Sequence, residues 1–331
     1  MKALVTGGGG FLGSHIVKAL RARGDEARVL ARGDYPELRA LGAETVRGDI
    51  TDAAATASAC AGIDVVFHTA AKAGGWGDPR EYEAINVAGT QHVIDGCRKA
   101  GVPVLVHTSS PSVVHVDGDV EGADESIPYA EHFTAHYPRT KMLSEKLALA
   151  ASDEKLKVVA LRPHLIWGPG DRHLLPRLVS RAKAGRLRRV GSGDPKCDTI
   201  YIDNCVQAHL LAADRLRAGA PLGGKAYFIS DDQPVGLWTM ANRMIGCAGL
   251  PPVTRSVPAG VAYAVGATLE AAHWLLRLDK EPVLTRFAAT QMSNAQWFNI
   301  AAAKRDLGYA PVVSVEEGLR RLAAAEAALS R

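Results

Sequence analysis

Cysteine is scarce in this sequence of 331 residues, and its five cysteines are far apart. They are Cys60, Cys97, Cys197, Cys205 and Cys247. No two of them have the spacing of a zinc site or of a redox-active pair. We therefore expect reduced thiols, a cytoplasmic location and no bound metal. Because an apolar run at residues 2–5 begins at once, we also expect no signal peptide.

An excess of charge of one sign is also lacking. The net charge is +4, and 22% of the residues are charged, with acidic residues placed among the basic ones. A surface that binds nucleic acid needs a denser basic face. We therefore expect no nucleic-acid partner.

Long apolar runs are lacking as well, with one exception at residues 259–278. Glu270, His273 and Arg277 interrupt this stretch, and an ionisable side chain in hydrocarbon is costly. We therefore expect no integral membrane segment, but a helix that covers an apolar pocket. Contact with a membrane surface is the alternative.

The sequence does contain a regular alternation of short apolar runs and helical patterns. The apolar runs lie at residues 2–5, 27–31, 44–47, 65–69, 104–108 and 158–161, and the helical patterns at 12–23, 51–61, 81–100 and 138–151. Such alternation predicts an α/β fold, a Rossmann-type doubly wound parallel sheet with helices on both faces. A sheet of this kind binds ligands at the carboxyl ends of its strands.

The alternation ends near residue 165. A Gly-Pro-Gly turn at 168–170 precedes a basic stretch at 172–189 that is helical in part, residues 199–202 and 226–230 resemble strands that rejoin the sheet or its edge, and a last helix is expected at 315–330. We expect residues 1–165 and about 199–235 to form an NADP(H)-binding Rossmann domain. Residues from about 166 to 198 and from 236 to 331 form a smaller, partly discontinuous C-terminal substrate lobe in this scheme.

A glycine-rich turn follows the first apolar run. Gly7, Gly10 and Gly13 stand three residues apart, between a predicted strand and a predicted helix. Glycines allow the backbone, including that of Phe11 and Leu12, to approach a dinucleotide pyrophosphate, which the positive end of the helix favours. The pattern predicts a dinucleotide site, in which the intervening glycines at 8 and 9 only add flexibility.

The residues after the second and third strands bear on the choice of cofactor. An acidic residue after the second strand favours NAD, but this sequence has Arg32 there. A guanidinium suits a 2′-phosphate, so we expect NADP(H), with NAD(H) as the alternative. Asp49 and Ile50 follow the third strand and are expected to bracket the adenine, unless Asp49 caps the next helix.

The end of the fourth strand is rich in small residues. The small side chains of Ala70 and Ala71, next to Lys72, let the backbone pass close to the nicotinamide ribose. Asn86, inside a predicted helix, is expected at the cofactor site, either as a tether between neighbouring segments or as a merely structural amide.

Tyr137 and Lys141 are four residues apart at the start of a predicted helix, so they lie on nearly one face. Pro138 disfavours a helical conformation for Tyr137, which we expect at the helix mouth, open to the cleft. A nearby ammonium lowers the pKa of a phenol, which helps proton transfer. Ser109 and Ser110 follow the fifth strand, and we expect Ser110 to hold a carbonyl oxygen as charge builds on it. These residues predict a nicotinamide-dependent oxidoreductase.

These residues resemble the extended short-chain dehydrogenase/reductase family, in its 3β-hydroxysteroid dehydrogenase-like branch. The motifs that carry the resemblance are Gly7-x-x-Gly10-x-x-Gly13, Gly48-Asp49-Ile50, His68-Thr69-Ala70-Ala71, Thr108-Ser109-Ser110, Tyr137-x-x-x-Lys141, Leu161-Arg162-Pro163 and Tyr201-Ile202-Asp203-Asn204. The resemblance implies catalytic roles for Ser110, Tyr137 and Lys141. It also implies that Pro163 lies beside the nicotinamide carboxamide.

Residues 70–77, 108–115 and 165–171 further resemble members of this family that act in bacterial long-chain olefin biosynthesis. That resemblance implies NADPH-dependent reduction of a long-chain 2-alkyl-3-oxoalkanoate, a β-keto acid, to the 3-hydroxy acid. It also implies delivery of the product to a β-lactone-forming enzyme. As in relatives, helices at 81–100 and 138–151 are expected to pair in a homodimer.

An apolar C-terminal lobe suits such a substrate. Its large apolar residues include Trp238, Met240, Met244, Tyr263, Trp274, Leu275, Leu276, Trp297 and Phe298. Individually they predict core packing, and together they could line a pocket for alkyl chains. Lys72, Arg172 and His173 are candidate ligands for the carboxylate, whereas the basic residues between 181 and 189 predict a solvated helix face.

Three other functions stay open. They are a 3β-hydroxysteroid-type dehydrogenase, a nucleotide-sugar epimerase or dehydratase, and a non-enzymatic sensor of NADP(H). The sensor has no use for Ser110, Tyr137 and Lys141, and a sugar diphosphate needs more polar contacts than this lobe offers.

Overall fold

A parallel sheet of seven strands lies at the centre of the computed structural model, which describes residues 1–114, 118–278 and 280–329. The strands are β1 (Lys2–Thr6), β2 (Glu26–Ala31), β3 (Glu44–Arg47), β4 (Val65–His68), β5 (Val104–Thr108), β7 (Lys157–Pro163) and β12 (Lys225–Ile229). Their order is β12-β7-β5-β4-β1-β2-β3. The order reverses between β1 and β4, which is where a doubly wound sheet opens a crevice for a ligand. The predicted fold class is confirmed.

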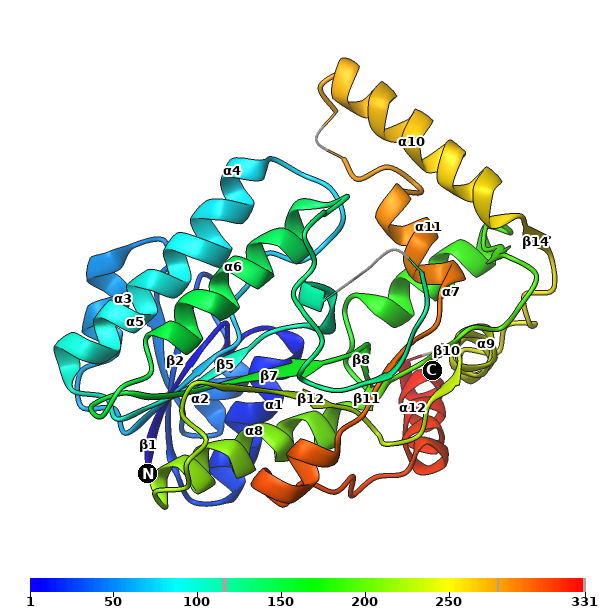
Figure 1. Ribbon diagram of the computed structural model, residues 1–331. Coiled ribbons are helices and arrows are strands. Elements are labelled where there is room, and N and C mark those ends of the chain that lie inside the picture. Colours follow the sequence, from blue (N-terminus) through cyan, green and yellow to red (C-terminus); the bar gives the residue numbers. More distant parts are fainter. Residues whose placement is uncertain (115–117, 279, 330–331) are drawn as a thin grey trace.

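Helices cover both faces of this sheet (Figure 1). On one face lie α1 (Phe11–Ala22) and α8 (Ile202–Arg217), and on the other α3 (Ala53–Ala59), α5 (Gly89–Ala100) and α6 (His136–Ala150). The predicted helix at 81–100 is divided into α4 (Pro79–Tyr82), a π-helical segment η1 (Glu83–Ala88) and α5. The short helix α2 (Pro36–Ala40) precedes β3.

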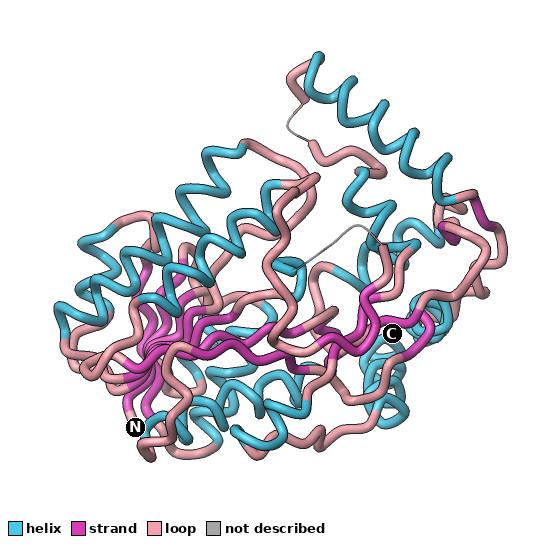
Figure 2. Tube along the Cα trace, viewed as in Figure 1, coloured by secondary structure: helices cyan, strands magenta, loops and turns pink. Residues whose placement is uncertain are grey.

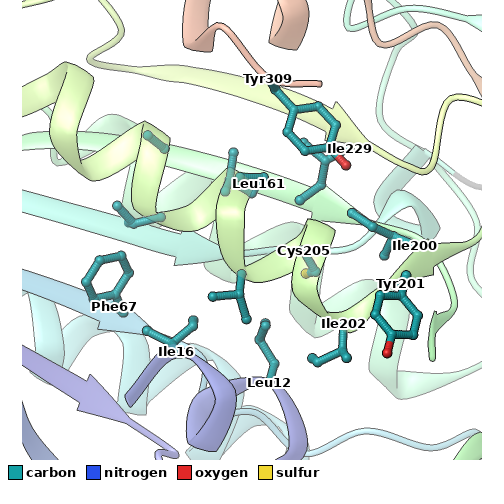
Figure 3. Close-up of a cluster of buried hydrophobic side chains, with 14 of the residues drawn as sticks. Leu12, Ile16, Phe67, Leu161, Ile200, Tyr201, Ile202, Cys205, Ile229 and Tyr309 are labelled. Atoms are coloured by element: carbon teal, nitrogen blue, oxygen red, sulfur yellow. The ribbon is translucent and has the colours of Figure 1, made fainter. Parts of the chain in front are cut away.

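The face under α1 and α8 contains the larger part of the apolar core (Figure 3). Leu12 and Ile16 of α1 lie near Phe67 of β4, Leu161 of β7 and Cys205 of α8, and all five are buried. Full burial of a large apolar side chain stabilises a fold by about 1.5–3 kcal/mol. This packing fixes α1, and hence the glycine-rich turn before it, against the sheet.

Most of the rest of the chain forms smaller elements beside the carboxyl edge of the sheet (Figure 2), whereas residues 303–307 pack against α8 and β12. The helical elements are η2 (Pro111–Val114), α7 (Leu174–Lys183), α9 (Leu237–Cys247), α10 (Ala259–Leu275), α11 (Arg286–Ser293), η3 (Ala303–Leu307) and α12 (Val315–Leu329). The strands are β6 (Val120–Ala123), β8 (Ile166–Trp167), β9 (Arg189–Val190), β10 (Lys196–Cys197), β11 (Ile200–Tyr201), β13 (Val235–Gly236), β14 (Ser256–Val257) and β15 (Gln296–Phe298). Ser330, the predicted last residue of the final helix, lies outside the described residues.

The two strands predicted after residue 165 have different fates. Residues 225–229 form β12, the edge strand of the main sheet next to β7. Residues 200–201 form β11, which pairs with β8 outside that sheet. Within residues 1–165, β6 pairs with β15 from the far end of the chain. The division into a Rossmann domain and a substrate lobe stays a prediction.

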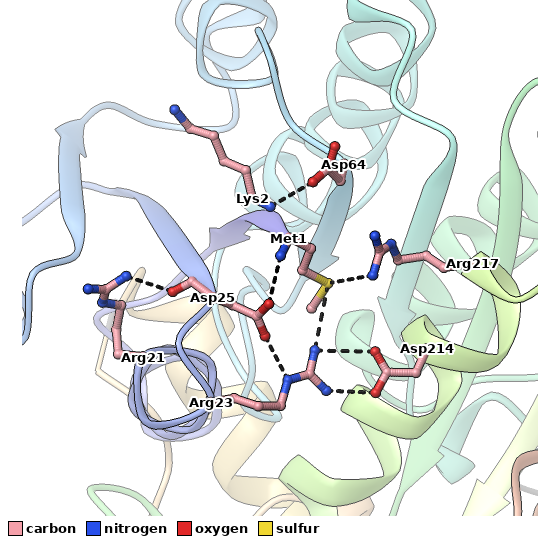
Figure 4. Close-up of polar contacts among 8 residues, drawn as sticks. All are labelled: Met1, Lys2, Arg21, Arg23, Asp25, Asp64, Asp214 and Arg217. Carbon is pink, nitrogen blue, oxygen red and sulfur yellow. Dashed lines mark hydrogen bonds and ion pairs between the residues drawn. The ribbon is translucent and has the colours of Figure 1, made fainter.

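The amino terminus is held by an ionic cluster (Figure 4). The Met1 ammonium donates to the Asp25 carboxylate at 2.8 Å, and Arg23 bridges Asp25 and Asp214 of α8 at 2.6 Å each. Burial raises the pKa of Asp25, but its hydrogen bonds with the terminal ammonium and Arg23 outweigh this and hold that pKa below the ordinary value. The cluster ties β1 and the end of α1 to α8.

Among the described residues, no helix has both the length and the apolar character needed to cross a membrane.

Candidate active site

The glycine-rich turn connects β1 to α1 at the carboxyl edge of the sheet. Gly7 has a φ of +70°, which favours glycine, and a Cβ there would lie 2.8 Å from the Ala70 Cα. A Cβ at Gly13 would lie 2.4 Å from the Gly7 carbonyl oxygen. The Gly10 amide closes the turn by donating to the Gly7 carbonyl at 2.8 Å. Gly7 and Gly13 are therefore required for the close packing of turn, helix and β4 loop.

Gly8 and Gly9 do more than add flexibility, and the sequence-based interpretation of them is wrong. A Cβ at Gly8 would lie 2.7 Å from a Val29 methyl, and one at Gly9 would lie 1.9 Å from the Tyr35 ring. Tyr35 stands after β2, and its ring lies so close to Gly9 that a side chain there would require the ring to move. Local sequence patterns do not reveal this contact, because Gly9 and Tyr35 are 26 positions apart in the chain.

The start of α1 is suited to an anion. Gly10 gives no side-chain cap, and the first turn of this 12-residue helix, which begins at Phe11 and Leu12, contains no acidic residue. Uncapped N–H groups at the positive end of a helix bind phosphate groups. The cradle therefore fits the pyrophosphate of a dinucleotide.

The ribose side of this cradle contains a charge pair. Arg32 is largely exposed, and its Nε lies 3.9 Å from the Asp49 carboxylate. Asp49 accepts hydrogen bonds from the Thr51 amide and hydroxyl, and Asp52, not Asp49, caps α3. The interpretation of Asp49 as a helix cap is therefore wrong. Ile50, next in the chain, is buried.

The loop after β4 is tied to α6 by Asn86. The Asn86 side chain accepts from the Lys72 amide at 2.7 Å and donates to the Lys72 carbonyl and to the Thr140 hydroxyl. Both N–H donors of the amide are used, so its contacts are those of a tether. Ala71 is exposed beside this loop, and the Lys72 ammonium pairs with Glu81.

The candidate catalytic side chains meet where β5 ends and α6 begins. A hydrogen bond links the Tyr137 phenol and the Ser110 hydroxyl. Ser109 is buried, and its hydroxyl has no hydrogen-bond partner among the residues that the structure describes. The Lys141 ammonium donates to the Thr108 carbonyl oxygen at 2.6 Å. The structure thus brings Ser110, Tyr137 and Lys141 to one edge of the sheet.

Two expectations about Tyr137 differ from the structure. The helix α6 begins at His136, so Tyr137 lies inside its first turn. The helix tolerates Pro138 in this turn although proline has no backbone N–H, because the first N–H groups of a helix have no intrahelical partner. Burial raises the pKa of Tyr137, and the hydrogen bond with Ser110 only partly offsets this rise. Any lowering by the Lys141 ammonium, which donates to the Thr108 carbonyl, does not outweigh the effect of burial.

Lys141 is buried beside Glu145, a residue that none of the sequence motifs included. Burial lowers its pKa to about 8, and the Glu145 carboxylate one turn further along α6 opposes that change. Glu145 in turn accepts two hydrogen bonds from Arg162, at 2.6 and 3.0 Å, and one from the Tyr129 hydroxyl. This buried ion pair joins α6 to β7, immediately before Pro163.

Buried histidines lie behind Lys141. His68 bonds the hydroxyls of Thr6 and Thr90 at 2.7 and 2.9 Å, and its ring centroid is 5.3 Å from that of His107. Burial, helped by the Lys141 charge, lowers the pKa of His68 to about 3 and that of His107 well below its usual value. Both rings are therefore neutral. The apolar strand patterns around His68 and His107 could have shown that these two side chains are buried. They could not have shown which hydroxyls His68 bonds.

An apolar cavity of about 200 Å³ lies between α7, α9 and α11. His164 and Leu165, which follow Pro163, form part of its wall. Of the nine large apolar residues expected to line a pocket, Trp238, Met240 and Met244 do so.

The other six of these apolar residues lie elsewhere. Trp297 packs on Gly122, and Phe298 stacks on Phe228 with ring centroids 4.1 Å apart. Tyr263, Trp274, Leu275 and Leu276 are exposed on and after α10. The helix predicted at 259–278 exists, but no residue of it lines this cavity.

The cations near the cavity are not the ones that were singled out. Arg177 and Arg181 lie on its wall, whereas Arg172 and His173 are exposed before α7. Arg181 donates to the Val283 carbonyl at 2.8 Å, and burial lowers its pKa. Its assignment to a solvated helix face is therefore wrong.

The fold and the residues gathered at the carboxyl edge of its sheet define a nicotinamide-dependent oxidoreductase. A family model described as the 3-beta hydroxysteroid dehydrogenase/isomerase family matches residues 4–256. The chain belongs to this family. The resemblance seen in the motifs and the expectation of an oxidoreductase are confirmed.

Known relatives cover nearly the whole chain. It is 50% identical over 331 residues to the 2-alkyl-3-oxoalkanoate reductase of Stenotrophomonas maltophilia, covering 99% of this chain and 100% of that one. The 2-alkyl-3-oxoalkanoate reductase of Shewanella oneidensis is 48% identical, over 97% of this chain and 85% of its own length. Among solved structures, MoeE5 in complex with UDP-glucose and NAD has a TM-score of 0.77 at 25% identity, and the match covers 100% of both chains.

Proposed function

We propose that this enzyme uses NADPH to reduce a long-chain 2-alkyl-3-oxoalkanoate to the 2-alkyl-3-hydroxyalkanoate. The observation that carries the proposal is the 50% identity, over essentially the whole chain, to a protein named for that reaction. The proposed site includes the glycine turn, the loop after β4 and the carboxyl end of β7, with Pro163 at the nicotinamide.

In the proposed mechanism the glycine turn and the loop after β4 would hold the dinucleotide, whose nicotinamide would supply the hydride for the substrate's carbonyl carbon. Ser110 donates a hydrogen bond to the carbonyl oxygen, and Tyr137 gives its phenolic proton to that oxygen as the alkoxide forms. The high pKa of free Tyr137 keeps the phenol protonated before the reaction. Lys141, one helical turn along, favours the resulting phenolate by its charge.

The apolar cavity is the proposed site of an alkyl chain. Its volume of about 200 Å³ is below the range of about 300–1,000 Å³ for pockets that enclose a drug-sized ligand. It therefore suits one segment of a chain, flanked by Arg177 and Arg181 as candidate ligands for the carboxylate. Ala241 lies on the cavity wall, so Ala241→Phe is expected to raise KM for long chains more than for short ones.

The experiment that tests the reaction is a substrate panel followed by NADPH absorbance. It compares 2-alkyl-3-oxoalkanoates of different chain lengths with 3-ketosteroids and UDP-sugars. Turnover limited to the keto acids supports the proposal, and turnover limited to steroids or sugars refutes it. The steroid candidate is retained because the family is named for 3-beta hydroxysteroids.

The preference for NADPH is tested separately. The exposed Arg32 guanidinium is proposed to bind the 2′-phosphate. Wild type is expected to have a higher kcat/KM with NADPH than with NADH, and Arg32→Ala is expected to remove most of the difference. A wild-type preference for NADH would show that the assignment is wrong.

Three further features are proposed on the same basis. The enzyme acts in the cytoplasm, in long-chain olefin biosynthesis, before a β-lactone-forming enzyme. It forms a homodimer through the helices predicted at 81–100 and 138–151. Sedimentation equilibrium tests the dimer, and a monomer at micromolar concentration would contradict it.

A further inference from the structure

The helix α10 has its apolar and polar sides reversed. The residues that face the protein are Ala262, Gly266 and Glu270, spaced four apart. Gly266 lies directly on the backbone at Thr285 and Arg286, and Glu270 accepts two hydrogen bonds from Arg286, at 2.6 and 2.7 Å. A helix on a water-exposed surface normally buries its large apolar residues and exposes its polar ones.

The large apolar side chains of this region point outward. On α10 and the three residues after it, they are Val261, Tyr263, Val265, Trp274, Leu275, Leu276 and Leu278. Trp274 is 77% exposed and Leu275 is 74% exposed. Figure 1 shows α10 along the outer edge of the molecule, with α11 on its inner side. We call these seven residues the α10 apolar face.

This face is continuous with the candidate active site. The Trp76 indole, in the loop after β4, donates to the Leu278 carbonyl at 3.2 Å, and its ring meets His273 edge-on. On the other side, Arg181 of the cavity wall donates to the Val283 carbonyl. The segment that follows α10 thus connects the loop of the cofactor site with the rim of the apolar cavity.

Cations flank the α10 apolar face. Between residues 172 and 189 the sequence has seven arginines and lysines and no acidic residue. Arg177 of this segment forms an ion pair with Glu281, and Arg181 donates to the Val283 carbonyl. Lys183 and Arg186 are exposed beside them, as is Arg277 at the end of α10. An apolar surface with a basic border is complementary to a bilayer with anionic headgroups.

We propose that the α10 apolar face docks on an anionic lipid surface, with Trp274, Leu275 and Leu276 inserted among the acyl chains. Lys183 and Arg186 lie then at the level of the headgroups. Docking places the rim of the cavity against the lipid phase, where molecules with long alkyl chains collect. The docking itself does not depend on the proposed substrate.

Vesicle flotation with the full-length chain tests this proposal. Wild type is expected to float with vesicles of phosphatidylglycerol and phosphatidylcholine, less with phosphatidylcholine alone, and less at high salt. The double variant Trp274→Ser, Leu275→Ser is expected to bind at least tenfold more weakly. The matched control is Leu329→Ser on α12, where the leucine is 81% exposed, and it should bind as wild type does.

A second arm reverses charge with Lys183→Glu and Arg186→Glu. These changes are expected to remove the preference for anionic vesicles. Because all these side chains are exposed, thermal unfolding should show unchanged midpoints. The proposal fails if wild type does not float at any lipid composition, or if Leu329→Ser weakens binding equally. It also fails if the Trp274, Leu275 variant instead turns a dimer into a monomer, since the face would then be a contact between copies.

Discussion

Replacement of Lys141 by methionine separates the stability of this fold from its function. Lys141 is buried, donates to the Thr108 carbonyl, and has a pKa lowered by burial from 10.5 to about 8. A lowered lysine pKa means that the charged ammonium reduces the free energy of unfolding, because it is less stable in the folded protein than in the unfolded chain. Lys141→Met should therefore abolish most turnover without unfolding the protein.

The magnitude follows from the two pKa values. Their difference of 10.5 to about 8, at about 1.4 kcal/mol for each pH unit, corresponds to about 3 kcal/mol. Removal of the ammonium recovers this free energy at pH 7, while the loss of the bond to Thr108 costs about 1–3 kcal/mol. At pH 7 the variant is expected to be as stable as wild type or up to about 2 kcal/mol more stable.

The pH dependence gives a sharper test. Between about pH 8 and 10.5 the unfolded chain binds a proton at Lys141 that the folded protein does not, so wild-type stability rises with pH in this window. Relative to Lys141→Met, wild type should gain about 3 kcal/mol across it. Urea unfolding without nucleotide, at several pH values, measures this difference, in which the other titrating groups cancel. Parallel stability curves for the two proteins would refute the reasoning.

Three other variants test separate parts of the structure. Tyr137→Phe should keep nucleotide affinity but lose about 10²–10⁴ in kcat, the usual contribution of a positioned acid; unchanged turnover would remove Tyr137 from the mechanism. Glu145→Gln leaves the buried Arg162 guanidinium unpaired and should lower the free energy of unfolding by about 3–5 kcal/mol in urea titrations. Gly9→Ala should weaken nucleotide binding in fluorescence titrations because its methyl group displaces Tyr35, and Tyr35→Ala should restore part of the loss. Additive effects of these two changes would argue against the contact.

The local pattern of the sequence was sufficient for the central sheet. Strands and helices have different periods of apolar residues, and a parallel sheet buried on both faces needs nearly continuous apolar runs. The predicted strands at 44–47 and 104–108 coincide with β3 and β5. The glycine spacing at Gly7, Gly10 and Gly13 also placed a close-packed turn, because backbone conformation at a turn depends on the residues that form it.

Contacts between distant segments decided the rest. The sequence could not show that Tyr35 covers Gly9 or that Lys141 donates to Thr108, because no spacing along the chain encodes such distances. It also could not give the sign of the pKa change at Tyr137, since that sign depends on how much water the folded protein removes from the phenol.

The outer part of the chain shows the same limit most clearly. The apolar character of residues 259–278 was evident in the sequence, and so was the helix. Which side of that helix meets the protein was decided by the fit of Gly266 and Glu270 against α11. A helical pattern states which residues share a face, but only the tertiary structure determines which face is buried, because that choice depends on the shape and polarity of the neighbouring element.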